Sequence, residues 1–195
     1  MTTVAIPSWN AEGVIPPIND LNNQTNAERS PYTVSLLDFA LRFNISLERR
    51  KVLQGFMEYR AKLHSAGLIQ GFQWLDGSFL EDIETIAQRP PNDIDVVTFY
   101  HLPVGKSQQD VLDIDPSFFR LSIPQLKNQF HTDAYLVSLG ISSERLIKEG
   151  TYWYSMWSHR RNQSWKGYVQ VDLAPNEDTV VNQALAQSAN QGVSL

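Results

Sequence analysis

Hydrophobic and polar positions follow a helical period through residues 30–66 of the chain. Over 30–44 the apolar side chains gather on one side of a helix, for which Ser30 fits the N-cap and Pro31 the first helical position. A second helix is expected over 46–66, and Gly67 fits its C-terminal cap. Two consecutive helices are therefore expected ahead of the first strand.

Shorter apolar runs, rich in β-branched and aromatic residues, predict strands further along the chain. The clearest are 93–102, 131–139 and 166–174, and 68–78 is typical of a strand that runs into a turn. The connector 79–92 has room for one helical turn. Strands and helices mix without a regular βαβ order, which indicates the α+β class with a short mixed sheet.

Composition fits one domain with two polar ends. The chain has 195 residues, of which 42% are hydrophobic and 19% charged, as in globular proteins. Residues 1–29 are rich in Pro, Asn and Thr, which indicates an irregular arm on the surface. The domain itself is expected over 30–174. Residues 175–195 are expected to be a polar tail, disordered apart from a weak helical stretch.

Charge and residue usage exclude several classes of protein. There is no cysteine, which excludes thiolate metal sites and Cys nucleophiles. The net charge of −5 argues against a broad electrostatic surface that binds nucleic acid. No apolar run is long enough to span a bilayer, and residues 1–16 lack the pattern of a signal peptide. A cytoplasmic protein with no membrane partner is expected.

Asp93 and Asp95 stand at the start of the strand expected over 93–102. Alternate side chains of a strand share a face, so both carboxylates point the same way, with β-carbons roughly 6–7 Å apart. Carboxylates this close repel each other unless a cation lies between them, and hard oxygen ligands suit Mg²⁺ or Mn²⁺. The alternative is a pair of solvated aspartates.

Gly77 and Ser78 follow the strand-like run 68–76. A glycine in such a turn lets the backbone approach a ligand closely, and backbone N–H groups together with a hydroxyl can hold phosphate oxygens. A Gly-Ser pair is also common in ordinary turns. The Gly-Ser pair therefore indicates a phosphate site only in combination with the aspartates that follow it.

Together, the Gly-Ser turn, the connector and the "DIDVV" strand resemble the signature of the polymerase-β-like nucleotidyltransferase superfamily. The runs "WLDGSFLED", "HTDAYLVSL" and "KGYVQVDL" are similar to a bacterial group of small stand-alone proteins within it, some suspected of toxin–antitoxin or phage-defence roles. The resemblance is best over 71–100 and extends loosely over 30–173. It implies a nucleotidyltransferase-like short mixed sheet flanked by helices.

The resemblance also implies a third carboxylate on a later strand, and Asp133 in "HTDAYLVSL" fits. Its implied role is to ligate the metal and to help deprotonate the attacking hydroxyl. Two rivals stay open. Asp172 lies in an alternating strand and is more typical of an outward carboxylate. The second Asp-Ile-Asp run, 113–115, precedes Pro116, so Asp115 fits a helix N-cap.

Basic and aromatic residues gather in the segment 153–166. The cations could hold a triphosphate or could be solvated in a loop, and the aromatic side chains could stack on a base or pack in the core. No histidine stands at zinc-ligand spacing from another. The residues in question are Trp153, Tyr154, Trp157, His159, Arg160, Arg161, Trp165 and Lys166.

The connector departs from the superfamily pattern. It is longer than is common, and it carries Glu81, Asp82 and Glu84 where many relatives have a basic residue. Acidic groups there would repel a triphosphate unless they face away or bind a second metal. Arg89 could compensate for them.

The function implied by the resemblance is a Mg²⁺- or Mn²⁺-dependent nucleotidyltransferase. It would move an NMP group from a nucleoside triphosphate, such as ATP, to an acceptor hydroxyl of RNA, protein or a small molecule and release pyrophosphate. The alternative is a weakly active or inert module of the same fold that binds a toxin or phage-defence effector. The implied metal ligands are Asp93, Asp95 and Asp133, and the implied phosphate ligands are Gly77, Ser78, Arg160, Arg161 and Lys166.

Overall fold

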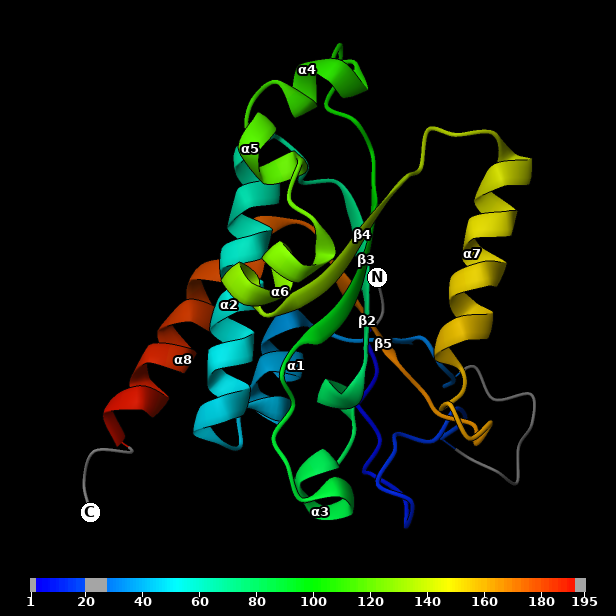
Figure 1. Cartoon of the computed structure of the whole chain (residues 1–195), viewed down its shortest axis with the longest axis vertical. Helices are drawn as coiled ribbons and strands as arrows, with labels where there is room; N and C mark the ends of the chain where they lie inside the picture. Colours follow the sequence, from blue (N-terminus) through cyan, green and yellow to red (C-terminus); the bar gives the residue numbers. More distant parts are fainter. Residues whose placement is uncertain (1–2, 20–27, 192–195) are drawn as a thin grey trace.

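The computed structural model describes residues 3–19 and 28–191, and within them the strands form one mixed five-stranded sheet (Figure 1). The strand order is β1-β5-β2-β3-β4. β2 is antiparallel to both β3 and β5, while β4 runs parallel to β3 and β1 parallel to β5. The expected α+β class with a short mixed sheet is confirmed. The strands are β1 (Tyr32–Thr33), β2 (Gly71–Asp76), β3 (Ile94–Tyr100), β4 (Thr132–Ser138) and β5 (Val169–Asp172).

The helices lie unevenly on the two faces of this sheet. Helices α1, α2, α6 and α8 cover one face, and α7 stands on the other (Figure 1). Two short 3-10 turns, η1 (Ser78–Leu80) and η2 (Pro175–Glu177), follow β2 and β5. The α-helices are α1 (Leu36–Phe43), α2 (Leu47–Ser65), α3 (Ile83–Ala87), α4 (Gln108–Leu112), α5 (Pro116–Phe119), α6 (Ile123–Phe130), α7 (Ser143–Trp157) and α8 (Asp178–Gln191).

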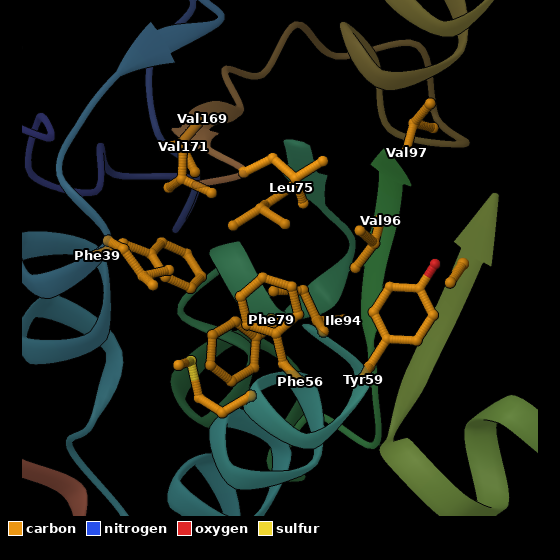
Figure 2. Packing of buried hydrophobic residues seen from close by; sticks show 14 of the residues in the cluster. Phe39, Phe56, Tyr59, Leu75, Phe79, Ile94, Val96, Val97, Val169 and Val171 are labelled. Atoms are coloured by element: carbon orange, nitrogen blue, oxygen red, sulfur yellow. The ribbon is translucent and has the colours of Figure 1, made fainter. Parts of the chain in front are cut away.

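The main core lies between the sheet and helices α1 and α2. Figure 2 shows Phe39 and Phe56 of these helices beside Phe79, with Ile94 and Val96 of β3 facing them. Val97 points to the opposite face of β3, toward the side that carries α7. Because alternate side chains of a strand share a face, Asp95 lies on the same face of β3 as Val97.

Several expected boundaries are confirmed. Helix α2 begins after Ser46, whose hydroxyl accepts a hydrogen bond from the backbone N–H of Arg49, and Gly67 follows the helix with a φ of +83°. Asp115 caps α5 by accepting from the N–H of Phe118. The four strands expected from the sequence all form.

The expected start of the first helix is wrong. Helix α1 begins at Leu36 with Ser35 as its N-cap, and residues 32–33 form β1 instead. The hydroxyl of Ser30 bonds to the backbone of Tyr168, which fixes this segment beside β5. Pairing with a strand more than a hundred residues away therefore overrides the local helix signal.

The two ends of the chain are more ordered than their composition predicts. Residues 178–191 form α8, which packs on α1 and α2, so the expected disordered tail is wrong for this part; 192–195 lie outside the described residues. In the arm, the described residues are irregular, as expected, yet Val14 and Ile15 are buried. The expected limits of the domain stay a prediction.

None of the helices in the described part of the chain combines the length and the apolar character needed to cross a membrane.

Candidate functional site

Three carboxylates lie side by side at one end of the sheet. In the strand register, Asp95 of β3 pairs with Asp76 of β2 on one side and with Asp133 of β4 on the other. Strands β3 and β4 are parallel and start at the same edge, where the antiparallel β2 ends. Asp93 precedes β3 at this edge. The sheet topology therefore brings the predicted Asp93, Asp95 and Asp133 together.

The negative charge of this cluster is only partly compensated. Burial, together with the charges of Asp76, Asp93 and Asp133, raises the pKa of Asp95 to about 7. Asp76 is 2% exposed, and burial raises its pKa despite a nearby lysine. The Oδ1 atoms of Asp76 and Asp133 are buried without a hydrogen-bond partner. Such a cluster attracts a cation.

Two lysines supply positive charge to the carboxylates. The Nζ of Lys127, on α6, lies 2.8 Å from an oxygen of Asp93 and 2.8 Å from an oxygen of Asp133. The Nζ of Lys166 lies 2.8 Å from Asp76 and 3.4 Å from Glu81. Each lysine thus joins two acidic side chains.

Asp76 and Lys127 were not predicted as site residues. Asp76 directly precedes the Gly-Ser turn, so the position itself was a signal that could have found it. Lys127 lies in a helix six residues before Asp133, and only the packing of α6 on β4 brings it to the site. No feature of the local sequence marks it.

The turn after β2 requires glycine. Gly77 has φ +88° and ψ −173°, a backbone region that is essentially closed to other residues. A Cβ atom added there would lie 3.0 Å from the Cγ of Asp95. Ser78 then begins η1 at the edge of the pocket. The backbone of this turn therefore touches the carboxylate cluster directly.

A pocket of about 710 Å³ opens over the cluster. The carboxylates and the Gly77-Ser78 turn line it, together with the end of α7 and residues 159–162. Arg89 and the exposed Arg161 also line it. The lining of the pocket thus combines acidic and basic side chains.

The acidic connector is largely neutralised inside the protein. The carboxylate of Glu81 forms an ion pair with Arg160 at 2.8 Å and a longer one, at 3.4 Å, with Lys166. Glu84 pairs with the buried Arg49, whose guanidinium also donates to the carbonyl oxygens of Phe79 and Glu81. Two of the predicted phosphate ligands, Arg160 and Lys166, are therefore already held by carboxylates.

The remaining candidates lie elsewhere or in the core. Asp172 is exposed, accepts a hydrogen bond from the N–H of Ala174 and does not line the pocket. Trp153 and Trp157 are buried. Trp165 is exposed, and the centroid of its ring lies 4.1 Å from the centroid of the His159 ring.

The chemistry of the cluster fits a divalent cation, although no ligand cage is formed. In the parts of the chain that the structure describes, no three His, Asp or Glu side chains stand in a geometry that could hold a metal ion. Lys127 lies between Asp93 and Asp133 instead. The donors are all carboxylate oxygens, and two buried oxygens lack a partner, which suits a hard cation.

Comparison with known proteins gives one match. The model of a family of unknown function (DUF6932) matches residues 7–172, which include every residue of the carboxylate cluster. No curated protein and no solved structure matches the chain.

Proposed function

Because the chain belongs to DUF6932, a family of unknown function, we propose its activity from the site itself: transfer of an NMP group from a nucleoside triphosphate to an acceptor hydroxyl, with Mg²⁺ or Mn²⁺. One observation carries the proposal. Asp93, Asp95 and Asp133 converge beside the glycine turn Gly77-Ser78 in a single pocket. The sequence motifs that resemble nucleotidyltransferases thus meet in space.

The proposed roles of the carboxylates follow from their positions. Asp93, Asp95 and Asp133 would hold the divalent ion, which when bound offsets the charge on phosphate oxygens. We assign the proton of the acceptor hydroxyl to Asp133, the carboxylate to which the resemblance gives this role, and one of its oxygens is free of hydrogen-bond partners. The acceptor oxygen forms a bond to the α-phosphorus, and the bond from that phosphorus to the pyrophosphate oxygen breaks.

The pocket has the size and the donors that a nucleotide needs. Its volume of about 710 Å³ lies within the range of small-molecule sites. We place the phosphates at the backbone N–H groups and hydroxyl of Gly77-Ser78, and Arg89 and Arg161, which also line the pocket, provide positive charge. Arg160 and Lys166 also line the pocket, where Arg160 pairs with Glu81 and Lys166 with Asp76 and Glu81.

A second candidate function has an observation in its favour. Lys127 already compensates two of the carboxylates, and Arg160 and Lys166 are paired with Glu81. A site whose carboxylates are already paired in part with its own lysines and arginine fits a module that has lost turnover. Such a module would act by binding a protein partner, in this case a toxin or a phage-defence effector.

Label transfer tests the proposal directly. We expect the purified protein, with Mg²⁺ or Mn²⁺ and a nucleoside triphosphate labelled at the α-phosphate, to transfer label to RNA, protein or a small hydroxyl compound. Asp95→Asn removes a carboxylate from the centre of the cluster, so transfer should fall by more than about 100-fold. Asp172→Asn, on the exposed edge of the sheet, is the matched control and should retain activity.

The outcomes separate the two candidates. Equal transfer by wild type and Asp95→Asn would reject the assigned chemistry. If no triphosphate is turned over and a partner protein binds equally well with and without Mg²⁺, the second candidate is supported.

A further inference from the structure

We propose that Lys127 is an internal counter-ion which occupies the carboxylate cluster in the metal-free protein and which a divalent ion must displace. This inference rests on the proposed function, since it assumes a metal site at Asp93 and Asp133. It adds that the chain itself competes for this site, so that the concentration of free metal ion decides whether the site is assembled.

The contacts of Lys127 show why ion and lysine exclude each other. Its Nζ lies 2.8 Å from Oδ2 of Asp93 and 2.8 Å from Oδ2 of Asp133. A divalent ion held by the same two oxygens would need the space between them that Nζ now fills, because metal–oxygen bonds are shorter still than these contacts. The two positive charges would also repel each other strongly at that distance. Only one of them can occupy the gap between the two carboxylates.

The surroundings of Lys127 allow it to leave. Its side chain is 39% exposed, lines the pocket and extends from α6 on a flexible four-carbon stem. Lys166, the other lysine of the site, is 8% exposed and is held by Asp76 and Glu81. The site therefore has one fixed lysine and one that can move into solvent.

Removal of Lys127 separates this role from a structural one. A merely structural lysine stabilises the fold, and its loss would weaken metal binding or leave it unchanged. A competing lysine lowers the apparent affinity for the metal, because the ion must first break two ion pairs. Loss of such a lysine strengthens metal binding while it destabilises the metal-free protein, in which the carboxylates then repel each other.

The experiment is calorimetric titration of Mn²⁺ into the nucleotide-free protein. We expect Lys127→Met to bind Mn²⁺ about five- to tenfold more tightly than wild type, the effect of two partly exposed ion pairs. Lys62→Met is the matched control: Lys62 pairs with Asp115 at 2.9 Å, is 43% exposed and lies outside the pocket. Its affinity for Mn²⁺ should equal that of wild type.

A second variant and a second measurement keep the test valid. Lys127→Gln removes the charge but keeps a polar side chain, and it should also bind Mn²⁺ more tightly. In thermal unfolding, both Lys127 variants should melt below wild type without metal and gain more from Mn²⁺ than wild type does.

The outcomes distinguish failure of the counter-ion role of Lys127 from failure of the metal site. Equal or weaker Mn²⁺ affinity in both Lys127 variants would overturn the counter-ion role and leave the metal site intact. If wild type, both Lys127 variants and Asp95→Asn all fail to bind Mn²⁺, the metal site itself is rejected together with the role of Lys127.

Discussion

Gly77 holds the turn after β2 against Asp95, and this contact leaves no space for a side chain. A Cβ atom at this position would meet the Cγ and Oδ2 atoms of Asp95 at 3.0 Å each. Gly105 also has a positive φ, of +75°, yet nothing lies within 4 Å of a Cβ placed there. The two glycines therefore share a backbone requirement but differ in their surroundings.

Gly77→Ala should consequently damage the site as well as the fold. Both Gly77→Ala and Gly105→Ala should lower the free energy of unfolding by about 1–3 kcal/mol, because alanine disfavours their backbone conformation. Only Gly77→Ala should also lose Mn²⁺ binding and nucleotide transfer, because it displaces Asp95. Urea unfolding and calorimetric titration measure the two effects. Normal Mn²⁺ binding by Gly77→Ala would show that the turn does not shape the cluster.

At the scale of elements, α8 completes the helical layer over the sheet. Val181 and Leu185 of this helix are buried, while Val180 is 42% exposed. Asp178, in the first turn of α8, forms an ion pair at 2.8 Å with the buried Arg60 of α2. The helix is thus attached by an apolar stripe and by a charged contact at its N-terminus.

The apolar stripe of α8 should contribute measurably to stability. Leu185→Ala leaves a cavity against α1 and α2 and should lower the free energy of unfolding by about 2–5 kcal/mol. Val180→Ala, on the exposed side of the same helix, should change it by no more than about 0.5 kcal/mol. Urea denaturation of both variants checks this. Equal effects would mean that α8 is not part of the cooperative fold.

The charged contact of α8 should make stability depend on pH. Burial opposes ionisation of Asp178, but hydrogen bonds from His64 and Arg60 outweigh it and hold the pKa of this carboxyl below its usual value. A lowered pKa means that the stabilisation is fully present above the unfolded-state pKa, about 3.9, and is lost as the pH falls through the folded-state value.

Comparison of wild type with Asp178→Asn measures this contribution. The difference in free energy of unfolding should be largest above about pH 5 and should shrink as the pH falls below about 4. Asp113→Asn, at the exposed end of α4, controls for the loss of one carboxylate. A difference that stays constant between pH 3 and 7 would contradict the ion pair.

At the scale of the whole molecule, the sheet unites segments that are distant in sequence. Asp76, Asp95 and Asp133 come from three strands, and the pocket is also lined by the end of α7 and residues 159–162. A ligand held by this site therefore contacts much of the fold at once. Its binding energy should stabilise the entire chain against unfolding.

Mn²⁺ should accordingly raise the unfolding temperature of the wild-type protein. At 100 times its dissociation constant, an ion that binds only the folded state adds about 2.7 kcal/mol to the free energy of unfolding. EDTA should reverse the effect, Asp95→Asn should abolish it, and Asp172→Asn should preserve it. A wild-type melting curve that does not respond to Mn²⁺ would contradict a metal site in this cluster.

The local sequence alone determined helix α2, most of α1, four strands and the position of Asp93 and Asp95 at the start of one of these strands. It could do so because helix and strand periods are properties of the backbone, which adjacent residues reveal. It also indicated Gly77, since its place after a strand marks a turn. Asp133 was found by resemblance, and the sheet then placed it beside Asp95.

Only the tertiary structure decided which charges meet. The burial of Asp76, the reach of Lys127 to two carboxylates and the pairing of Glu81 with Arg160 depend on strand register and helix packing between distant segments. The same holds for β1, which replaced an expected helix start. Charge interactions fall off with distance in space and not along the chain, so the electrostatics of the site emerge only once the sheet has assembled.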